Sequence, residues 1–213
     1  MDMELRDARE DYQKGSLSEN HLPQRPLDLF ESWLKEYKDT GNKDHNAMLL
    51  TTVKEDNSPS SRIVLLKGIA KEGLEFYTNY QSNKAKEMSK NPNIGLTFFW
   101  PDLERQIRIE GQVEKMSPEE SDAYFNIRPR ASQIGAWVSP QSEAIKNREY
   151  LEERISFFEE KFKGMEVPRP EHWGGYRLMP SFYEFWQGRS SRLHDRICYK
   201  KQDSNWLIER RAP

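Results

Sequence analysis

Cysteine is nearly absent from this sequence of 213 residues, in which Cys198 is the only example. A single cysteine cannot form an intrachain disulfide, and this favours a reducing compartment. The four histidines are scattered along the chain, at His21, His45, His172 and His194. Because they do not combine with the cysteine into a zinc-type ligand spacing, we predict no metal site.

Long hydrophobic runs and a strong net charge are missing as well. No apolar run approaches the roughly 20 residues that span a bilayer, and the charged residues 1–7 lack the apolar core of a signal peptide. The formal net charge of −2 argues against general nucleic-acid binding, which depends on a positive surface. We therefore expect a cytoplasmic protein that binds neither membranes nor nucleic acids.

Glycine-rich phosphate loops are a third absence. No G-x-G-x-x-G follows an expected strand and no Walker A loop occurs, so the common nucleotide cradles are excluded. Side chains must therefore hold any phosphorylated ligand, and the candidates are clusters of cations.

The patterns that are present indicate short strands with helices between them. Leu27, Phe30, Leu34 and Tyr37 share one face of a helix, and the segment Ser117–Glu120 is a capping box that begins another. We predict helices at 26–40, 83–90, 118–128 and 147–162, and residues 4–12 also allow a short helix. We predict strands at 47–53, 61–69, 74–78, 94–100, 105–116, 175–179, 183–187, 192–200 and 206–210.

The strands follow one another in hairpin-like pairs, without the strand–helix–strand alternation of a doubly wound sheet. This order favours a mainly β protein with α additions (α+β), in which an antiparallel sheet forms a closed or half-closed barrel. We interpret residues 1–25 as a flexible arm and residues 26–213 as a single domain.

Two clusters of cations lie on or just after the expected strands. Arg62 and Lys67 have opposite parity on a regular strand and face opposite sides, unless a bulge intervenes. A barrel strand with a charge at each end is the simpler interpretation. Lys84 lies in the first turn of a helix, where free N–H groups bind anions, but an ordinary cap by Ser82 or Asn83 explains the sequence equally well.

A third cluster joins a phenol, a guanidinium and a hydroxyl. Tyr124 and Arg128 are four residues apart on a predicted helix and share one face, and Ser132 follows a break at Pro129. Together they have the groups to receive a phosphate. From these residues alone, a packed Tyr124 and a solvated Arg128 remain the favoured alternative.

The fourth cluster lies near the end of the chain. Arg192, His194 and Arg196 point the same way if this segment is extended, and Trp186 supplies a flat apolar wall nearby. Surface strands rarely gather these residue types, so this cluster favours a functional role.

Several blocks of sequence match a known family in order and spacing. They are Arg62-Ile63-Val64-Leu65-Leu66-Lys67, Phe76-Tyr77-Thr78-Asn79, Ser132-Gln133-Ile134-Gly135-Ala136, Trp173-Gly174-Gly175, Glu184-Phe185-Trp186-Gln187-Gly188, Arg192-Leu193-His194-Asp195-Arg196 and Arg211-Ala212-Pro213. From about Tyr12 to Pro213, the chain resembles the pyridoxine/pyridoxamine 5′-phosphate oxidase family.

The resemblance implies an antiparallel Greek-key split β-barrel that binds FMN at a homodimer interface, with two sites per dimer. It places at flavin positions Arg62, Ile63, Val64, Leu65, Lys67, Tyr77, Thr78, Asn83, Lys84, Gln106, Gln141, Ser142, Trp186 and Arg196. It places at substrate positions Arg9, Tyr12, Lys67, Tyr124, Arg128, Ser132, Arg192, Leu193 and His194, of which Arg192 and His194 are the expected catalytic residues.

The implied reaction is oxidation of pyridoxine 5′-phosphate or pyridoxamine 5′-phosphate to pyridoxal 5′-phosphate, in vitamin B6 biosynthesis and salvage. By this resemblance a hydride moves from substrate C4′ to flavin N5, and O2 reoxidises the flavin to give hydrogen peroxide. Binding of the phosphate orients the ring, while Arg192 and His194 lie over it.

Two positions depart from the family pattern. Asn83 stands where the family commonly has a flavin-phosphate arginine, and a lost charge-assisted hydrogen bond costs about 1.5–3 kcal/mol. We predict weaker FMN retention unless another cation compensates. Glu10 and Asp11 make the arm acidic, which argues against its closing over an anionic substrate.

Three alternatives stay open. An FMN split-barrel oxidoreductase with another substrate would not need Tyr124, Arg128 and Ser132 together with Arg192 and His194. A non-catalytic carrier of vitamin B6 phosphate would bind pyridoxal phosphate without retaining flavin. A purely structural homodimer gives no reason for the clustered cations.

Overall fold

The structure is a computed structural model that describes residues 11–213. Arg9, which is predicted to bind substrate, and nearly all of the segment 4–12 lie outside the described residues.

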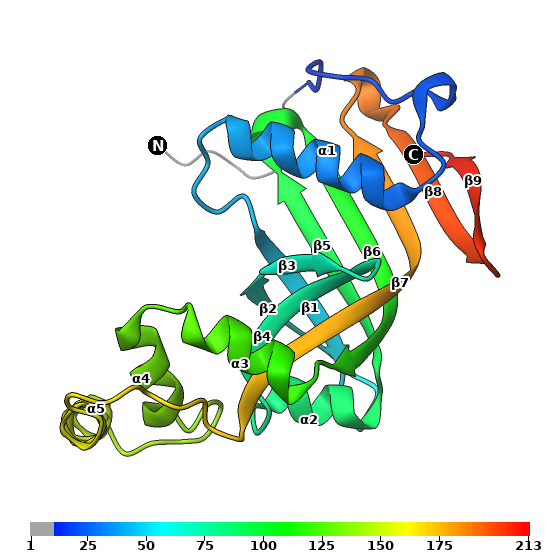
Figure 1. The fold of residues 1–213 in the computed structure, drawn as a ribbon. Helices are drawn as coiled ribbons and strands as arrows, with labels where there is room; N and C mark the ends of the chain where they lie inside the picture. The colour runs from blue at the N-terminus through cyan, green and yellow to red at the C-terminus, as the bar shows by residue number, and fades with distance from the viewer. Residues whose placement is uncertain (1–10) are drawn as a thin grey trace. The chain divides into compact units, whose positions relative to one another are not determined.

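Antiparallel strands dominate the described residues, with helices between groups of strands (Figure 1). The hydrogen-bonded strand order is β2-β1-β5-β6-β7-β4-β3, with β8 paired to β7 and β9 paired to β8. The strands are β1 (Ala47–Val53), β2 (Pro59–Leu65), β3 (Gly68–Ala70), β4 (Gly73–Asn79), β5 (Asn93–Trp100), β6 (Arg105–Lys115), β7 (Trp173–Gln187), β8 (Asp195–Gln202) and β9 (Asn205–Arg211). The helices are α1 (Pro26–Asp39), α2 (Asn83–Lys90), α3 (Pro118–Asn126), α4 (Arg130–Val138) and α5 (Arg148–Lys161), with short 3-10 turns η2 (Glu19–His21), η3 (Pro101–Leu103) and η4 (Ser190–Arg192). The predicted class, an antiparallel sheet with α additions, is confirmed.

The chain divides into two compact units. Among the described residues, unit 1 comprises 11–50, Gly95–Gly111 and Pro180–Pro213, and unit 2 comprises Thr51–Ile94 and Gln112–Met179. The single domain expected over 26–213 stays a prediction.

Helix α1 lies against the strands of unit 1 (Figure 1), and aromatic side chains form the contact. The ring centroids of Phe30 and Phe98 lie 5.1 Å apart, and Tyr37 stacks on Trp100 at 5.3 Å. Burying one such side chain stabilises the fold by about 1.5–3 kcal/mol. The helical conformation is favoured here because it places these apolar residues on one buried face. Pro26 lies in its first turn, where a missing N–H leaves no hydrogen bond unmade.

The end of the chain forms an antiparallel ladder in unit 1. Glu184 of β7 lies opposite Cys198 of β8, and β9 continues the ladder on the other side of β8. The Leu17 N–H donates to Asp195 Oδ2 at 3.0 Å, so part of the predicted arm is bonded to this ladder. The flexibility of the arm stays a prediction.

Unit 2 is built on β4, which pairs with β3 and with the first part of β7. Arg177 on β7 is buried and donates to Glu75 Oε1 at 2.6 Å and to Glu120 Oε1 at 2.9 Å. A Cβ at Gly73 would lie 2.5 Å from Arg177 Cγ, so this glycine leaves room for the arginine stem. The ion pairs tie helix α3 to the sheet of unit 2.

Helices α3, α4 and α5 share an apolar core within unit 2. The predicted capping box is confirmed, because the Glu120 N–H donates to Ser117 Oγ at 3.1 Å and the Ser117 N–H donates to Glu120 Oε2 at 3.0 Å. Buried side chains of this core are Phe125, Ile134, Ala136, Val138, Phe158, Phe162, Val167 and Trp173.

Two strand predictions are wrong in how they divide the chain. The predicted strand 61–69 is two strands, because β2 pairs with β1 whereas β3 pairs with β4, and the chain turns between them. The predicted strands 175–179 and 183–187 are one continuous β7. Pairing with β4 ends at Leu178 and pairing with β8 begins at Phe182, so Pro180 lies where neither ladder needs its missing N–H.

The strand predicted at 192–200 is wrong at its start. Ser191 and Arg192 have φ values of 56° and 61°, in the left-handed region, and β8 begins only at Asp195. Strand alternation therefore does not place Arg192, His194 and Arg196 on one face.

The helix predicted at 118–128 ends at Asn126, and α4 was not predicted at all. Pro129 ended the predicted helix, but in the structure it also occupies the N-cap position of α4. The spacing of Ile134 and Val138 was the signal that could have revealed this second helix.

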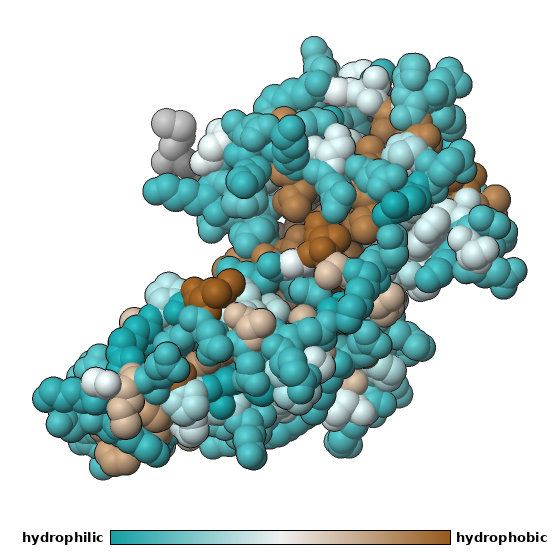
Figure 2. Space-filling view, in the orientation of Figure 1, coloured by the Kyte–Doolittle hydropathy of each residue, from teal (hydrophilic) through white to brown (hydrophobic). Residues whose placement is uncertain are grey.

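Hydrophilic side chains cover most of the face that Figure 2 shows, and hydrophobic side chains surface in a few places. The most exposed large apolar side chains among the described residues are Ile127, Leu193 and Ile63, at 78%, 70% and 64% exposed. None of the helices in the described part of the chain is long and apolar enough to span a membrane.

Candidate active site

A half-buried lysine lies at the start of α2 in unit 2. Lys84 Nζ donates to Thr78 Oγ1 at 3.1 Å, to Ser82 Oγ at 3.2 Å and to Gln141 Oε1 at 3.2 Å. Burial, followed by the positive charge of Arg62, lowers the pKa of Lys84 to about 8. These acceptors are neutral, so the lysine charge is available to an anion.

The helix that carries Lys84 has no side-chain cap. Ser82 occupies the N-cap position, but its hydroxyl donates to the Asn79 carbonyl at 2.7 Å and accepts no backbone N–H of the helix. The ordinary-cap interpretation is therefore wrong for Ser82. Ser82 also belongs to the lysine cluster, which the sequence did not indicate.

Arg62 lies on β2 beside a partner that was not predicted. Its Nη1 donates to Thr52 Oγ1 at 2.5 Å, and its Nη2 donates to Ser60 Oγ at 2.6 Å and to Glu87 Oε2 at 3.1 Å. Thr52 also donates to Glu87. The carboxylate of Glu87 therefore balances the charge of Arg62 and fixes its position against α2.

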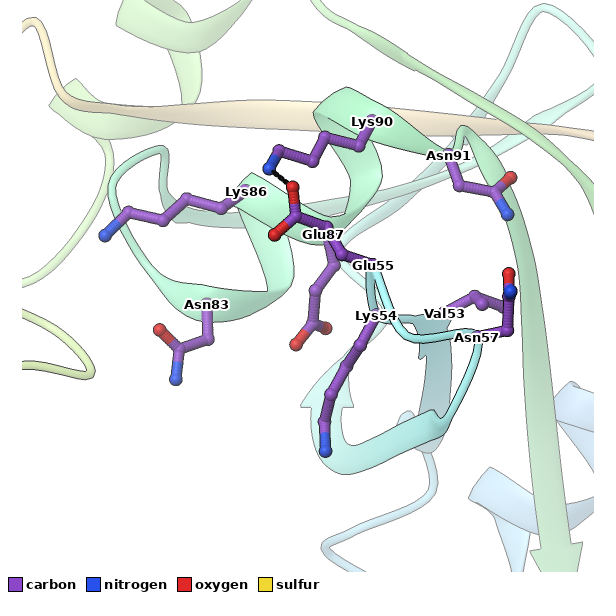
Figure 3. A pocket seen from close by; sticks show the side chains of 9 residues that line it. All are labelled: Val53, Lys54, Glu55, Asn57, Asn83, Lys86, Glu87, Lys90 and Asn91. Atoms are coloured by element: carbon purple, nitrogen blue, oxygen red, sulfur yellow. Dashed lines mark hydrogen bonds and ion pairs between the residues drawn. The ribbon is translucent and has the colours of Figure 1, made fainter.

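Asn83 lines a polar pocket of about 430 Å³ in unit 2 (Figure 3). Lys54 and Lys86 line the same pocket, and Lys90 in its wall is paired with Glu55. These lysines are the cations that share a pocket with Asn83. Weaker FMN retention caused by Asn83 stays a prediction.

A second cation in unit 2, Arg128, lies against a stack of aromatic rings. The Tyr77 and Tyr124 centroids lie 3.9 Å apart, and Tyr77 lies 5.5 Å from Trp173, with all three rings nearly parallel. Arg128 Cζ lies 4.4 Å from the centroid of Trp173. Burial raises the pKa of Tyr124 and lowers that of Arg128.

The guanidinium of Arg128 is incompletely bonded. Its Nη1 is buried and has no hydrogen-bond partner among residues 11–213. Arg128 lies beyond the end of α3, two residues after Asn126, so the predicted helical spacing is wrong. The structure nevertheless brings it to the same ring stack as Tyr124, and the interpretation of Arg128 as a fully solvated cation is wrong.

The other predicted site residues of unit 2 lie on strands, on turns and at the start of α4. Ser132 is half-buried in the first turn of α4, and the side chain of Lys67 is exposed between β2 and β3. Ser142 is exposed and has a left-handed φ of 73°. Ile63, Val64 and Leu65 lie on β2.

Tyr12 meets two predicted site residues within unit 1. Its ring centroid lies 5.8 Å from that of Trp186 and 5.9 Å from that of His194, and Trp186 and His194 are 4.6 Å apart. A Cβ at Gly188 would lie 2.8 Å from the Tyr12 ring, so this glycine admits the tyrosine. The structure therefore brings Tyr12, Trp186 and His194 together.

The loop before β8 fixes the orientation of His194. The Arg189 N–H donates to His194 Nδ1 at 3.1 Å, so Nδ1 is the acceptor and the neutral ring carries its proton on Nε2. Arg192 and Leu193 are exposed on the same loop. The Arg192 side chain makes no hydrogen bond or ion pair within the described part of the chain.

A buried carboxylate holds Arg196 in unit 1. Arg196 Nη2 donates to Glu184 Oε2 at 2.8 Å, and its Nη1 donates to the Ala212 carbonyl at 2.8 Å. The bond to Glu184 raises the pKa of Arg196. Gln106, also predicted to bind cofactor, is half-buried on β6. Sequence reasoning did not assign Glu184 to the site, although it lies in the block Glu184–Gly188.

Family comparisons cover most of the chain. A family model described as pyridoxamine 5′-phosphate oxidase matches residues 34–160, and one described as the pyridoxine 5′-phosphate oxidase C-terminal dimerisation region matches residues 173–213. A pyridoxine/pyridoxamine 5′-phosphate oxidase of Pseudomonas fluorescens is 50% identical over 100% of both chains. One from Polynucleobacter asymbioticus is 52% identical over 96% of this chain and 97% of its own.

Solved structures share the fold of this chain. PhzG from Burkholderia lata, in complex with tetrahydrophenazine-1-carboxylic acid, has a TM-score of 0.86 at 28% identity over 91% of this chain and 95% of its own. A pyridoxamine 5′-phosphate oxidase-related, FMN-binding protein from Nostoc punctiforme has a TM-score of 0.72 at 17% identity over 90% of this chain and 100% of its own. The predicted split-barrel fold is confirmed by these matches. With two family models and full-length relatives in agreement, the chain belongs to the pyridoxine/pyridoxamine 5′-phosphate oxidase family.

Proposed function

We propose that this chain is an FMN-dependent oxidase that converts pyridoxine 5′-phosphate or pyridoxamine 5′-phosphate to pyridoxal 5′-phosphate. The observation that carries the proposal is the state of Arg128. Its guanidinium is held by aromatic faces and has a buried nitrogen without a partner among the described residues. A buried donor left unpaired costs about 1–3 kcal/mol, so an anion at this position would remove that cost. The relatives named above act on substrates that carry such a group.

The residues of unit 2 fit the phosphate of FMN. Lys84 is a half-buried cation that donates only to neutral oxygens, those of Thr78, Ser82 and Gln141. A phosphate would replace these weak acceptors with a charged one. FMN, when bound, would supply the redox chemistry by accepting a hydride from substrate C4′, with O2 as the final electron acceptor. With pyridoxamine 5′-phosphate the reaction would also consume water and release ammonia.

The protein residues bind and orient the substrate. Arg128, with Lys67, Tyr124 and Ser132, would hold the phosphate, and this binding energy would align the ring for reaction. Arg192 would supply a positive charge over the ring. The His194 Nε2–H would donate to the oxygen or nitrogen on C4′, because the Arg189 amide occupies the other ring nitrogen.

A homodimer is part of the proposal. The matched C-terminal model describes residues 173–213 as a dimerisation region. Trp186, Arg192, His194 and Arg196 all lie within that region. Two FMN sites per dimer follow from the family resemblance.

Aerobic turnover tests the proposed function. The purified protein is saturated with FMN and mixed with pyridoxine or pyridoxamine 5′-phosphate, and pyridoxal 5′-phosphate and hydrogen peroxide are measured together. We expect the two products in equal amounts, and a much higher KM for pyridoxamine that lacks the phosphate. No product from FMN-loaded protein would indicate a different substrate, whereas no product and no FMN binding would indicate a carrier.

Lys84 makes FMN binding dependent on pH. Only the protonated lysine attracts phosphate, and its pKa of about 8 lies below the usual value because of burial. Phosphate binding raises that pKa, so affinity is highest below about pH 8 and falls as the pH rises through it. The second phosphate pKa is about 6, so the phosphate is nearly all dianionic above about pH 7 and its own titration does not contribute as the pH rises through 8.

The test measures the Kd of FMN at several pH values between about 6.5 and 9.5. We expect a loss of about tenfold or more at the alkaline end, which corresponds to one charge-assisted hydrogen bond. Lys84→Met should bind FMN weakly at every pH, with a flatter profile. A wild-type Kd that does not change across this range would contradict the role of Lys84.

A further inference from the structure

The Trp173-Gly174-Gly175 motif marks the point where β7 meets the ring stack in unit 2. Trp173 is buried and is the first residue of β7, opposite Asn79 of β4. It has no place among the predicted site residues. Its ring nevertheless contacts residues predicted to bind both cofactor and substrate, so its function needs an explanation.

Trp173 holds Arg128 without neutralising it. Arg128 Cζ lies 4.4 Å from the Trp173 centroid and 5.5 Å from that of Phe125, and no carboxylate pairs with it in the described part of the chain. A carboxylate partner would compete with an incoming anion. An aromatic face attracts the cation through its quadrupole and leaves the N–H donors available.

Trp173 also fixes the position of Tyr124. The two rings are nearly parallel at 8°, with centroids 6.3 Å apart, and Tyr77 of β4 stacks on Tyr124 at 3.9 Å and on Trp173 at 5.5 Å. Phe125 meets Trp173 edge-on at 5.2 Å. The indole therefore contacts the Arg128 guanidinium together with the rings of Tyr124 and Phe125.

The two glycines of the motif allow neighbouring tyrosine side chains to pack directly against the backbone of β7. A Cβ at Gly175 would lie 2.9 Å from Tyr77 Cε1, so a larger residue would push Tyr77 away from the stack. The Gly174 backbone likewise leaves room for the Tyr80 hydroxyl. The motif therefore combines one large ring with two positions where side chains are excluded by their neighbours.

We propose that Trp173 is a positioning residue for substrate phosphate: it holds the Arg128 guanidinium and the Tyr124 phenol in the orientation that receives the anion. This inference rests on the proposed function. It adds to the phosphate-binding set a residue that touches no substrate. Because phosphate contacts are the same in the ground state and the transition state, their loss raises KM more than it lowers kcat.

The test compares Trp173→Leu and Trp173→Phe with Trp137→Leu. Trp137 is a matched control, because it packs against the same core at Phe158 and Phe162 and makes no contact with Tyr124 or Arg128 in the described structure. The two readouts are the KM of pyridoxine 5′-phosphate and the inhibition constant of inorganic phosphate, both with saturating FMN.

We expect both constants to rise about tenfold in Trp173→Leu, which is about 1.4 kcal/mol, with kcat changed by less than about threefold. Trp173→Phe keeps a ring and should lie between this variant and wild type, and it decides the question if the leucine variant does not fold. Trp137→Leu should leave both constants unchanged.

Two results would overturn the inference: unchanged constants in both Trp173 variants, or an equal rise in Trp137→Leu, which would indicate general loosening of the core. Neither result affects the proposed function, which depends on wild-type turnover. A wild-type protein without turnover would instead refute the proposed function on which this inference rests.

Discussion

Arg192→Ala is expected to lower kcat/KM for pyridoxamine 5′-phosphate by about 100-fold or more, the usual cost of losing a group that stabilises transition-state charge. The same variant is expected to keep its FMN. Its melting temperature should also stay close to that of wild type.

The structure explains why these effects separate. Arg192 is exposed, and its side chain has no hydrogen bond or ion pair within residues 11–213. Its removal leaves no buried group unpaired and little packing lost. Arg196 is different, because its guanidinium is bonded to Glu184 and to the Ala212 carbonyl. Removing Arg192 should therefore leave the fold intact, so that a kinetic effect would report on the proposed role of Arg192 in catalysis.

The measurement combines steady-state kinetics with the flavin content of the purified protein. Arg192→Lys keeps the charge but loses the planar fork, and it should recover only part of the activity. Arg148→Ala removes another exposed arginine, on α5, and serves as the control for general effects. Loss of FMN from Arg192→Ala, or near-normal kinetics, would refute its assignment to the substrate.

Arg177→Met should have the largest effect on stability. We expect a loss of about 3–5 kcal/mol in the free energy of unfolding, the usual cost of breaking a buried ion pair from one side. The reason is Glu75, which is 8% exposed and would remain buried without its counter-charge. Burial lowers the pKa of Arg177, but its bonds to Glu120 and Glu75 outweigh this and raise it, so the guanidinium is charged in the native protein.

Urea denaturation of the wild type, of Arg177→Met and of Arg177→Met/Glu75→Gln measures this effect. The double variant removes the uncompensated charge and should recover a substantial part of the lost stability, since contacting residues are not additive. If the double variant were no more stable than the single one, the loss would come from packing and not from the buried carboxylate.

Much of the fold was predictable because local patterns decide it. Helices α1 and α2 and strand β1 occur where the apolar period, prolines and turn residues indicate them. The errors have a common cause in long-range pairing. The division of 61–69 depends on which neighbour each half pairs with, and the continuity of β7 past Pro180 depends on where two ladders begin and end. Neither fact is present in local sequence.

The candidate site was predictable from blocks of residues but not from their geometry. Sequence reasoning found Arg62, Lys84 and Arg128 as cations but could not show which of the three has a carboxylate partner. Arg62 has Glu87 as a partner, and that contact joins residues 25 positions apart. The proposed role of Trp173 was missed for a similar reason, since a tryptophan in a sequence predicts only that its side chain packs in a core. Only the structure shows that a cation lies over its ring.

The stacked rings of unit 2 also have an optical consequence. Trp173 is one of 6 tryptophans, and it lies nearly parallel to Tyr77 and Tyr124 with a guanidinium over its ring. Electronic transitions of rings held this close and in fixed orientation couple to one another, which gives this cluster a signal of its own in near-ultraviolet circular dichroism. An anion that approached Arg128 would change the field across the indole. In the apoprotein, which is free of flavin absorbance, we therefore expect this signal to change when phosphate binds at Arg128, without any added label.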